Sequence, residues 1–481
     1  MKRKFVVVAF GLAAVGLFLI SSFAQRVDYD IVIANGRVMD PESKLDAVRY
    51  VGIRGKSIAA ISATPLKGKR TIDAKGMVVA PGFIDLHEHG QIAANYEAQA
   101  LDGVTSSFEL EVGTADVARW YAERAGKAIV NFGVSIGHIP VRMAVLGDKG
   151  EWLPTGPAVS KAATDGEIAQ MKQRIEEGLR QGAVAVGFGP AYTPAASVWE
   201  VQEMFRMAAR HQASCHVHMR EAREPAIGAL SELIAAAHVS GAPLHIVHIN
   251  STGTQWTPQL LQIIGEARAH GMDITTECYP YVAGMTRIES ALFDEGFQQR
   301  LGVDYKDLQW PETGERMTPE SFARFRKQGG GVIIFSNTDE MVRLAVLSPL
   351  TMIASDGIEF KDGKGHPRAA GTYSRILAQY VRKENALPLM EAIRKMSLMP
   401  AQRLEKRVPM MKNKGRIRVG TDADIVVFDP ARVTDRATYE QPTNASEGFQ
   451  AVLVNGVVVV QESKLVTGVT PGVAIRRPVS K

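Results

Sequence analysis

Two histidines stand one residue apart at the end of an apolar run, in the stretch PGFIDLHEHG. They are His87 and His89, and Glu88 lies between them. If the run is a β-strand, both imidazoles share one face and can reach the same ion, whereas Glu88 faces the other way. A lone strand histidine is more often a hydrogen-bonded core residue than a metal ligand, so the rest of the chain must supply further ligands.

Titratable side chains also stand at or near the ends of several later apolar runs. They are Glu109 and Glu111 in VTSSFELEVG, His138 and Arg142 in VNFGVSIGHIPVR, His216, His218 and Arg220 in CHVHMR, His245 and His248 in LHIVHINS, and Asp356 in TMIASDG. Burial of so many titratable groups is costly unless a cation or a hydrogen-bond network satisfies them. Imidazole and carboxylate ligands together favour a divalent ion such as zinc.

Helical and strand patterns alternate through the middle of the chain, over residues 81–410, in units of about 30 residues. The count fits eight units, which predicts an eight-stranded (β/α)8 barrel of class α/β; the alternative is a doubly wound open sheet. An insertion near residues 295–330 shows no strand pattern and is a candidate lid. In a barrel the active site lies at the carboxyl ends of the strands, which would bring the polar residues above together.

Both ends of the chain are rich in short strand patterns. Asn35-Gly36 and Asn455-Gly456 each follow alternating apolar residues, which is a strong hairpin signal. The simplest arrangement is a small β-sandwich domain formed from both chain ends, residues 25–80 and 411–481, with the barrel inserted between them.

The N-terminus carries the pattern of a secretory signal peptide over residues 1–24. A basic MKRK precedes the apolar run FVVVAFGLAAVGLFLI, and the small residues Ser22 and Ala24 precede a cut before Gln25. This pattern predicts a periplasmic or secreted protein without stable membrane association after cleavage. The alternative is an uncleaved anchor, because the apolar run is close to the lower limit for spanning a bilayer.

The overall composition is that of a globular protein with a sizeable core. The chain has 481 residues, of which 46% are hydrophobic and 22% charged, and its formal net charge is +5. Lysine and arginine are scattered without a basic stripe, which argues against a nucleic-acid partner. The two cysteines, Cys215 and Cys278, fall within predicted strands and are expected to be buried and unpaired.

The stretches PGFIDLHEHG, HVHMR, IVHIN and SDG together resemble the amidohydrolase superfamily. GHIPVR, YPYVAG, HPRAAGTYSRIL and GRIRVGTDADIVVFDP resemble, more narrowly, the D-aminoacylase or N-acyl-D-amino-acid deacylase group. The resemblance implies a zinc enzyme in which His87, His89, His218 and His248 are metal ligands. It also implies that Asp356 is the catalytic carboxylate that handles protons.

The chain departs from that group at two positions. Val112 stands where the group has a metal-binding cysteine, so a strand-three glutamate would have to substitute; Glu111 is the first choice and Glu109 the alternative. Whether one zinc ion or two would bind is left open. Asn250 stands where the group often has a lysine for the substrate carboxylate, and the candidates for that task are Arg220, Arg287 and Arg368.

The predicted reaction is hydrolysis of a small N-acyl-D-amino acid or of a related amide. His138 or Tyr192 could stabilise the oxyanion, and Tyr281 with Tyr279 could line the pocket. The alternatives are a cyclic amidase or dipeptidase on the same scaffold and a non-catalytic metal-containing binding protein. The sequence carries no signal for the oligomeric state.

Overall fold

The computed structural model describes residues 28–479, so the predicted signal peptide, residues 1–24, lies outside the described part of the chain. Eight parallel strands form the central sheet. They are β6 (Phe83–Asp85), β7 (Val104–Thr114), β8 (Asn131–Gly137), β9 (Ala185–Phe188), β10 (Ser214–Val217), β11 (Leu244–Ile246), β12 (Ile274–Cys278) and β16 (Thr351–Ile353), paired in this order. A parallel bridge between Glu88 and Gly357, just beyond β6 and β16, nearly closes the sheet into a barrel. The barrel prediction is therefore confirmed.

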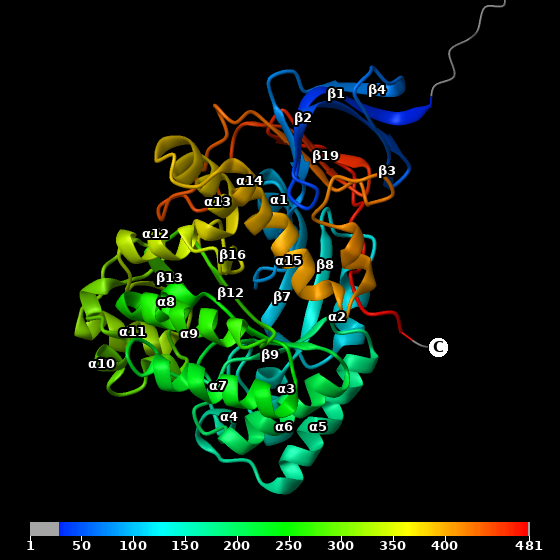
Figure 1. Ribbon diagram of the computed structural model, residues 1–481. Helices are drawn as coiled ribbons and strands as arrows, with labels where there is room; N and C mark the ends of the chain where they lie inside the picture. The colour runs from blue at the N-terminus through cyan, green and yellow to red at the C-terminus, as the bar shows by residue number, and fades with distance from the viewer. Residues whose placement is uncertain (1–27, 480–481) are drawn as a thin grey trace, which may run out of the picture.

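Helices surround the barrel (Figure 1). They are α1 (Ala93–Leu101), α2 (Val117–Arg124), α3 (His138–Leu146), α4 (Pro157–Ser160), α5 (Asp165–Arg180), α6 (Val198–Arg210), α7 (Ala226–Ser240), α8 (Ile249–Gly253), α9 (Thr257–Ala269), α12 (Asp339–Leu347), α13 (Arg368–Arg375), α14 (Leu389–Ile393) and α15 (Met399–Glu405). The sequence of α5 explains its position: Thr164 and Glu167 form a capping box, and Ile168, Met171 and Ile175 recur at helical spacing on its buried face.

The two chain ends form one nine-stranded sheet, drawn in blue and red in Figure 1. Its strands are β1 (Tyr29–Asp40), β2 (Leu45–Arg54), β3 (Ser57–Ser62), β4 (Gly68–Asp73), β5 (Val78–Pro81), β17 (Ile425–Phe428), β18 (Phe449–Val454), β19 (Val457–Gln461) and β20 (Lys464–Leu465). The N-terminal and C-terminal parts meet where β5 pairs with β17 in antiparallel register. A separate β-domain built from both ends is thus present, as the sequence predicts.

One of the two predicted hairpins is wrong. Asn455-Gly456 does connect β18 to β19, but Asn35-Gly36 lies inside β1, where the pairing with β2 is irregular between Ile33 and Gly36. Asn35 has a φ of +62° there. An asparagine-glycine pair tolerates the positive φ of a β-bulge as readily as that of a turn, so the same signal serves both structures.

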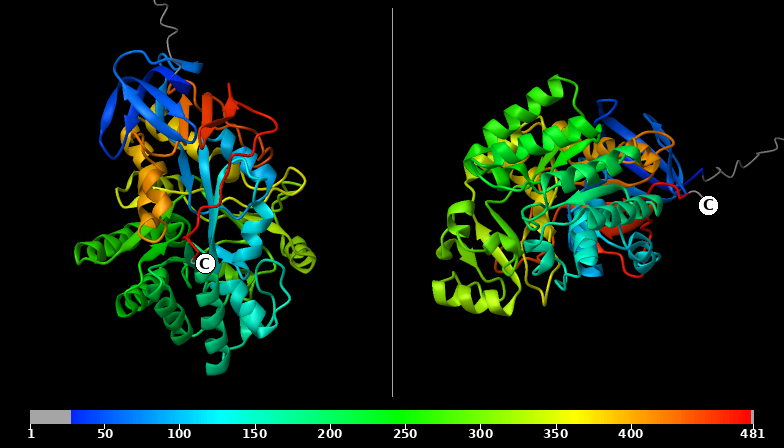
Figure 2. Two further views of the ribbon diagram at one scale, coloured as in Figure 1. Left: turned by 90° about the vertical axis from the view of Figure 1, so that its right-hand side faces the viewer. Right: turned by 90° about the horizontal axis from the view of Figure 1, so that it is seen from below.

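Within residues 295–330, where the sequence shows no strand pattern, the structure has one two-residue strand, Leu308–Gln309, which belongs to a sheet with two strands that flank the insertion. β13 (Ala283–Arg287), β14 (Leu308–Gln309) and β15 (Gly331–Phe335) form a three-stranded sheet accompanied by α10 (Phe297–Leu301) and α11 (Pro319–Gln328). The rings of Trp310 and Phe325 stack in the core of this unit, with 4.1 Å between their centroids. β14 is too short to show a periodic pattern, which explains why it was not predicted. Figure 2 shows the unit at the side of the barrel.

Two further observations concern membranes and thiols. Across residues 28–479, no helix combines the length and the apolar character that a membrane crossing requires. Cys215 in β10 and Cys278 in β12 are both buried and free, as expected.

A buried polar cluster ties the barrel to the small domain. Asp424 accepts hydrogen bonds from Asn131 of β8 at 3.0 Å and from the backbone N–H of Asn455 at 2.6 Å. Lys414 Nζ lies 2.6 Å from the same carboxylate, and both side chains of this ion pair are almost fully buried. Removal of one member of a buried pair leaves the other charge uncompensated, so this contact should contribute strongly to stability.

We predict that Lys414→Met destabilises the protein by about 3–5 kcal/mol, because Asp424 would stay buried without its counter-ion. Urea unfolding followed by circular dichroism measures the change. Lys412→Met is the matched control, since Lys412 is exposed two residues away. Equal stability of the two variants would show that the cluster does not hold the domains together.

Candidate metal centre

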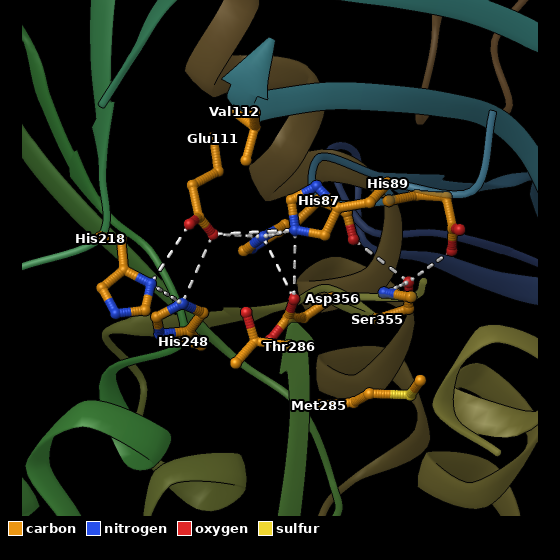
Figure 3. A network of polar contacts seen from close by, with 12 residues as sticks. His87, His89, Glu111, Val112, His218, His248, Met285, Thr286, Ser355 and Asp356 are labelled. Atoms are coloured by element: carbon orange, nitrogen blue, oxygen red, sulfur yellow. Dashed lines mark hydrogen bonds and ion pairs between the residues drawn. The ribbon is translucent and has the colours of Figure 1, made fainter. Parts of the chain in front are cut away.

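His87 and His89, which follow β6, converge with two carboxylates at the carboxyl end of the barrel strands. Their Nε2 atoms lie 3.1 Å apart. Glu111 Oε2 lies 2.7 Å from His87 Nε2, and Asp356 Oδ1 lies 3.4 and 3.5 Å from the Nε2 atoms of His87 and His89. We call these four residues the first ligand set (Figure 3).

A second group of possible ligands lies directly beside the first. Glu111 Oε1 is 3.2 Å from His218 Nδ1, and Glu111 Oε2 is 3.5 Å from His248 Nε2. The two imidazoles are 3.0 Å apart. We call Glu111, His218 and His248 the second ligand set. Glu111 belongs to both sets, so its carboxylate would serve as a ligand in either one.

Backbone conformation helps to aim two of these side chains. Asp356 follows β16 with a φ of +52°, and His248 follows β11 with a φ of +31°. Residues other than glycine rarely adopt positive φ, and such strain concentrates at functional sites. Gly187 of β9 is also required, because a Cβ there would lie 2.2 Å from the carbonyl oxygen of Glu111. This close approach fixes the strand that carries the shared carboxylate.

Further polar groups hold the imidazoles from behind. Glu277 Oε1 accepts a hydrogen bond from His87 Nδ1 at 2.6 Å, and Glu109 Oε2 accepts one from His89 Nδ1 at 2.6 Å. Thr252 Oγ1 lies 3.2 Å from His248 Nδ1. A carboxylate on the far nitrogen fixes the tautomer and ring orientation of a metal-ligating histidine. Glu109 therefore supports His89 from behind, and Glu111 is the residue at the candidate ion positions. Both belong to β7, which is the second strand of the barrel and not the third.

The electrostatics of the two sets call for positive charge. Burial would lower the pKa of His87, but the carboxylates of Asp356, Glu277 and Glu111 raise this pKa well above its ordinary value. Burial would raise the pKa of Glu111, but His218 and His87 hold it well below its usual range. Protons on imidazoles or a metal cation can supply the charge that these buried carboxylates require.

The donor atoms also fit a zinc-like ion. Zinc–ligand bonds of about 2.0–2.2 Å in a tetrahedron place neighbouring donors roughly 3.3–3.6 Å apart. Distances between an imidazole nitrogen and a carboxylate oxygen in the first ligand set range from 2.7 to 3.9 Å. Nitrogen and oxygen donors of this kind suit zinc and related divalent ions.

Both ligand sets border a cavity of about 360 Å³. Its lining includes His89, Glu111, His218, His248, Asp356, Trp152, Tyr192, Arg220, Tyr279 and Arg368. Tyr192 and Arg220, predicted to contact substrate, thus lie in the cavity wall. Arg220 is already paired with Glu232 at 3.0 Å.

The other three predicted substrate contacts lie elsewhere. His138 is fully buried beside Glu200, with 2.7 Å between its Nε2 and Oε1 of that carboxylate, and it does not line the cavity. Tyr281 donates its hydroxyl to the carbonyl of Pro367 at 3.4 Å outside the cavity lining. Arg287 pairs with Glu289 at 2.6 Å and lines an adjoining cavity of about 330 Å³.

Sequence reasoning missed several residues around the centre. Glu277 is the single carboxylate of the strand ITTEC (β12), and a lone carboxylate among strand residues was the available sequence signal. No sequence pattern indicated Trp152. This residue lies in a loop between α3 and α4, and its indole packs against the His89 ring with 4.9 Å between the ring centroids. Ser355 donates to Glu88 and joins the ends of β16 and β6.

Comparison with known proteins agrees with this geometry. A model of the amidohydrolase family matches residues 70–460. A D-aminoacylase from Alcaligenes xylosoxydans xylosoxydans is 30% identical, over 90% of this chain and 95% of its own. A solved structure of an N-acyl-D-glutamate deacylase from Bordetella bronchiseptica is also similar, with a TM-score of 0.81 at 25% sequence identity. The match covers 93% of this chain and 99% of that one. That structure is a complex with zinc and a phosphonate mimic of the tetrahedral intermediate.

A second solved structure, a D-aminoacylase with a binuclear metal centre, resembles this chain as strongly as the deacylase structure does. Its TM-score is 0.81 at 26% identity, and the match covers 93% of this chain and 100% of that one. The family model spans most of the chain, and the fold and the clustered ligands agree with it. The chain therefore belongs to the amidohydrolase family, as an enzyme related to the N-acyl-D-amino-acid deacylases.

Proposed function

We propose that this enzyme hydrolyses the amide bond of N-acyl-D-amino acids with the help of zinc. The observation that carries the proposal is the convergence of Glu111, Asp356 and four histidines, of which His89, His218 and His248 line one cavity together with both carboxylates. The D-aminoacylase and N-acyl-D-glutamate deacylase relatives support the substrate class. A cyclic amidase, a dipeptidase or a silent binding protein is less well supported, because the first two curated relatives in the sequence comparison, which match most of the chain, are a D-aminoacylase and an N-acyl-D-glutamate deacylase.

The two ligand sets are the residues that would hold the ion or ions. A bound zinc ion supplies Lewis acidity, which makes water more acidic and polarises a carbonyl group. Glu277 and Glu109 keep the Nε2 atoms of His87 and His89 directed at the ion position.

Asp356 is the residue placed to move the proton. Its carboxylate lines the cavity, with Oδ1 toward His87 and His89 and Oδ2 2.9 Å from Arg368 Nη1. Burial would raise the pKa of Asp356, but Arg368 and His87 lower it to about 2, so the group is ionised at neutral pH. It can then accept the proton of the attacking water and deliver it to the leaving nitrogen.

Arg368 is the best-placed group for the substrate carboxylate. It is a buried cation that lines the cavity, and its guanidinium packs over the Tyr279 ring at 4.8 Å. Arg220 and Arg287 are each paired with a glutamate, whereas Arg368 is paired with Asp356 of the first ligand set. Asn250 is buried, with its amide donating to the carbonyl of Tyr279, and does not line the cavity.

Tyr192 is the proposed oxyanion donor. It lines the cavity, and its ring packs against His218 at 4.9 Å. Its hydroxyl lies 3.2 Å from that of Thr286, a contact that a substrate oxygen could replace. Export remains a further proposal, supported by the basic, apolar and small-residue order of residues 1–24.

We predict that removal of divalent metal abolishes hydrolysis of an N-acetyl-D-amino acid and that zinc restores it. The physical reason is that neutral water is too weak a nucleophile without a Lewis acid. Activity is measured after dialysis against a chelator, then after zinc is added back in steps, with magnesium as the control addition. Full activity of the metal-free protein would contradict the proposal.

Asp356→Asn should lower kcat by roughly 10²–10⁴-fold, because the amide keeps the shape of the side chain but cannot accept the proton. Steady-state kinetics on zinc-loaded protein measures the loss. The matched control is Asp362→Asn, an exposed position six residues along the same segment, which should leave kcat unchanged. Wild-type turnover by the Asp356 variant would exclude its proposed role.

A substrate panel tests the proposed stereochemistry and class. The N-acetyl-D form of an amino acid should be cleaved with a kcat/KM at least about tenfold above that of the N-acetyl-L form, a dipeptide and a dihydropyrimidine, a difference of about 1.4 kcal/mol in transition-state binding. The ratios come from amine release under identical conditions. Preference for the dihydropyrimidine or the dipeptide would support the alternative enzymes instead.

A further inference from the structure

A cavity of about 500 Å³ lies at the amino ends of the barrel strands, opposite the metal centre, and we call it the basal cavity. Its wall includes Ser214, the first residue of β10, and Pro243 and Asp273, which directly precede β11 and β12. In (β/α)8 barrels this face does not carry the active site. The volume is within the range of small-molecule sites. The basal cavity is therefore a possible binding site separate from the catalytic one.

The lining of the basal cavity carries an excess of positive charge. Its two carboxylates are already paired, because Asp273 Oδ1 lies 2.7 Å from Arg403 Nη1 and Glu405 Oε2 lies 2.8 Å from Arg416 Nη2. Six cationic side chains line the cavity: Arg268, Arg394, Arg403, Lys406, Arg407 and Lys412. Within residues 28–479, Arg394 and Arg403 are the only two of the six that form ion pairs. A concave surface with such an excess of one charge attracts anions.

One of the cations without an ion pair is buried. The guanidinium of Arg407 donates hydrogen bonds to the carbonyl oxygens of Leu179 and Ala183, at 3.0 and 2.8 Å. These oxygens satisfy its N–H groups, but in the described part of the chain its charge has no counter-ion. Burial and the charge of Arg477 lower the pKa of Arg407 to about 9. An anion in the basal cavity would offset the cost of burying this charge.

A second buried arginine has a hydrogen-bond donor that is not used. Arg403 is 8% exposed, and its Nη1 donates to Asp273 Oδ1 at 2.7 Å and to Thr275 Oγ1 at 3.3 Å. Its Nε is buried and has no acceptor among the residues that the structure describes. Buried donors without an acceptor are unfavourable and rare. Since Arg403 lines the cavity, an anion bound there would supply the missing acceptor.

We propose that the basal cavity binds a small anion that carries two or more negative charges in phosphate or carboxylate groups. Arg403 is the fixed recognition element, because a guanidinium binds either group through paired hydrogen bonds. Arg268 and Lys406, both exposed, supply further donors, and Arg407 supplies charge from the buried wall. The site lies at the other end of the barrel from the metal centre, so the proposal does not depend on the proposed hydrolysis.

Isothermal titration calorimetry of the zinc-loaded, full-length protein tests the proposal. Inorganic phosphate and succinate are titrated separately at low ionic strength, where charges are little screened. Phosphate binding alone would indicate a phosphate-bearing ligand, and succinate binding alone a dicarboxylate. The double variant Arg268→Gln with Lys406→Gln should weaken binding of the probe by about tenfold or more, because charge-assisted hydrogen bonds are lost.

The matched control removes the same net charge outside the basal cavity. Lys127→Gln with Lys383→Gln changes two exposed lysines that do not line the cavity, and it should keep the wild-type affinity. Arg403→Lys is a second test, since it keeps a positive charge beside Asp273 but removes the guanidinium. It should also weaken binding by about tenfold or more. Circular dichroism shows whether each variant is folded.

The outcomes decide between a built site and a general attraction to a basic protein. Weaker binding in both cavity variants, with wild-type affinity in the control, supports the proposal. Failure of wild-type protein to bind either probe overturns it. Binding that the cavity variants leave unchanged also overturns it, because the anion then lies elsewhere, for example at the metal centre. An equal loss in the control variant shows that net charge alone is responsible and overturns it as well.

Discussion

The Glu111 carboxylate lies among imidazoles that approach it from three different strands of the barrel. His87 follows β6, His218 follows β10 and His248 follows β11, and each has a nitrogen within 3.5 Å of a Glu111 oxygen. A buried carboxylate is costly unless positive charge compensates it. The rest of the site depends on this requirement, because a cation between Glu111 and the histidines satisfies all of them together.

The fold meets the requirement through its strand ends. A nearly closed parallel barrel brings the carboxyl ends of eight strands to one place, so residues distant in sequence meet around one cavity. Glu88 serves the barrel and not the cavity: its buried carboxylate accepts hydrogen bonds from Ser355 and Asn95 where β16 meets β6. Successive side chains of an extended segment point to opposite faces. His87 and His89 therefore lie at the metal centre, whereas Glu88 between them lies where the barrel closes.

Much of this arrangement was predictable because it depends on local periodicity. The helix and strand patterns indicated the barrel, and the two-residue spacing placed His87 and His89 on one face. The same period could not separate Glu109 from Glu111, since both share a face of β7; only the three-dimensional contacts show Glu109 behind His89 and Glu111 between the ligand sets. Glu200, which engages His138, comes from a helix far along the chain, and no local pattern reveals such a partner.

The most direct test of the account is an anomalous diffraction map of zinc-loaded crystals, collected on both sides of the zinc absorption edge. The account predicts zinc at coordination distance from the Glu111 carboxylate, with His87 and His89 among its ligands. Zinc bound elsewhere, or zinc held by the histidines while Glu111 points away from it, would contradict the central claim that this carboxylate organises the site.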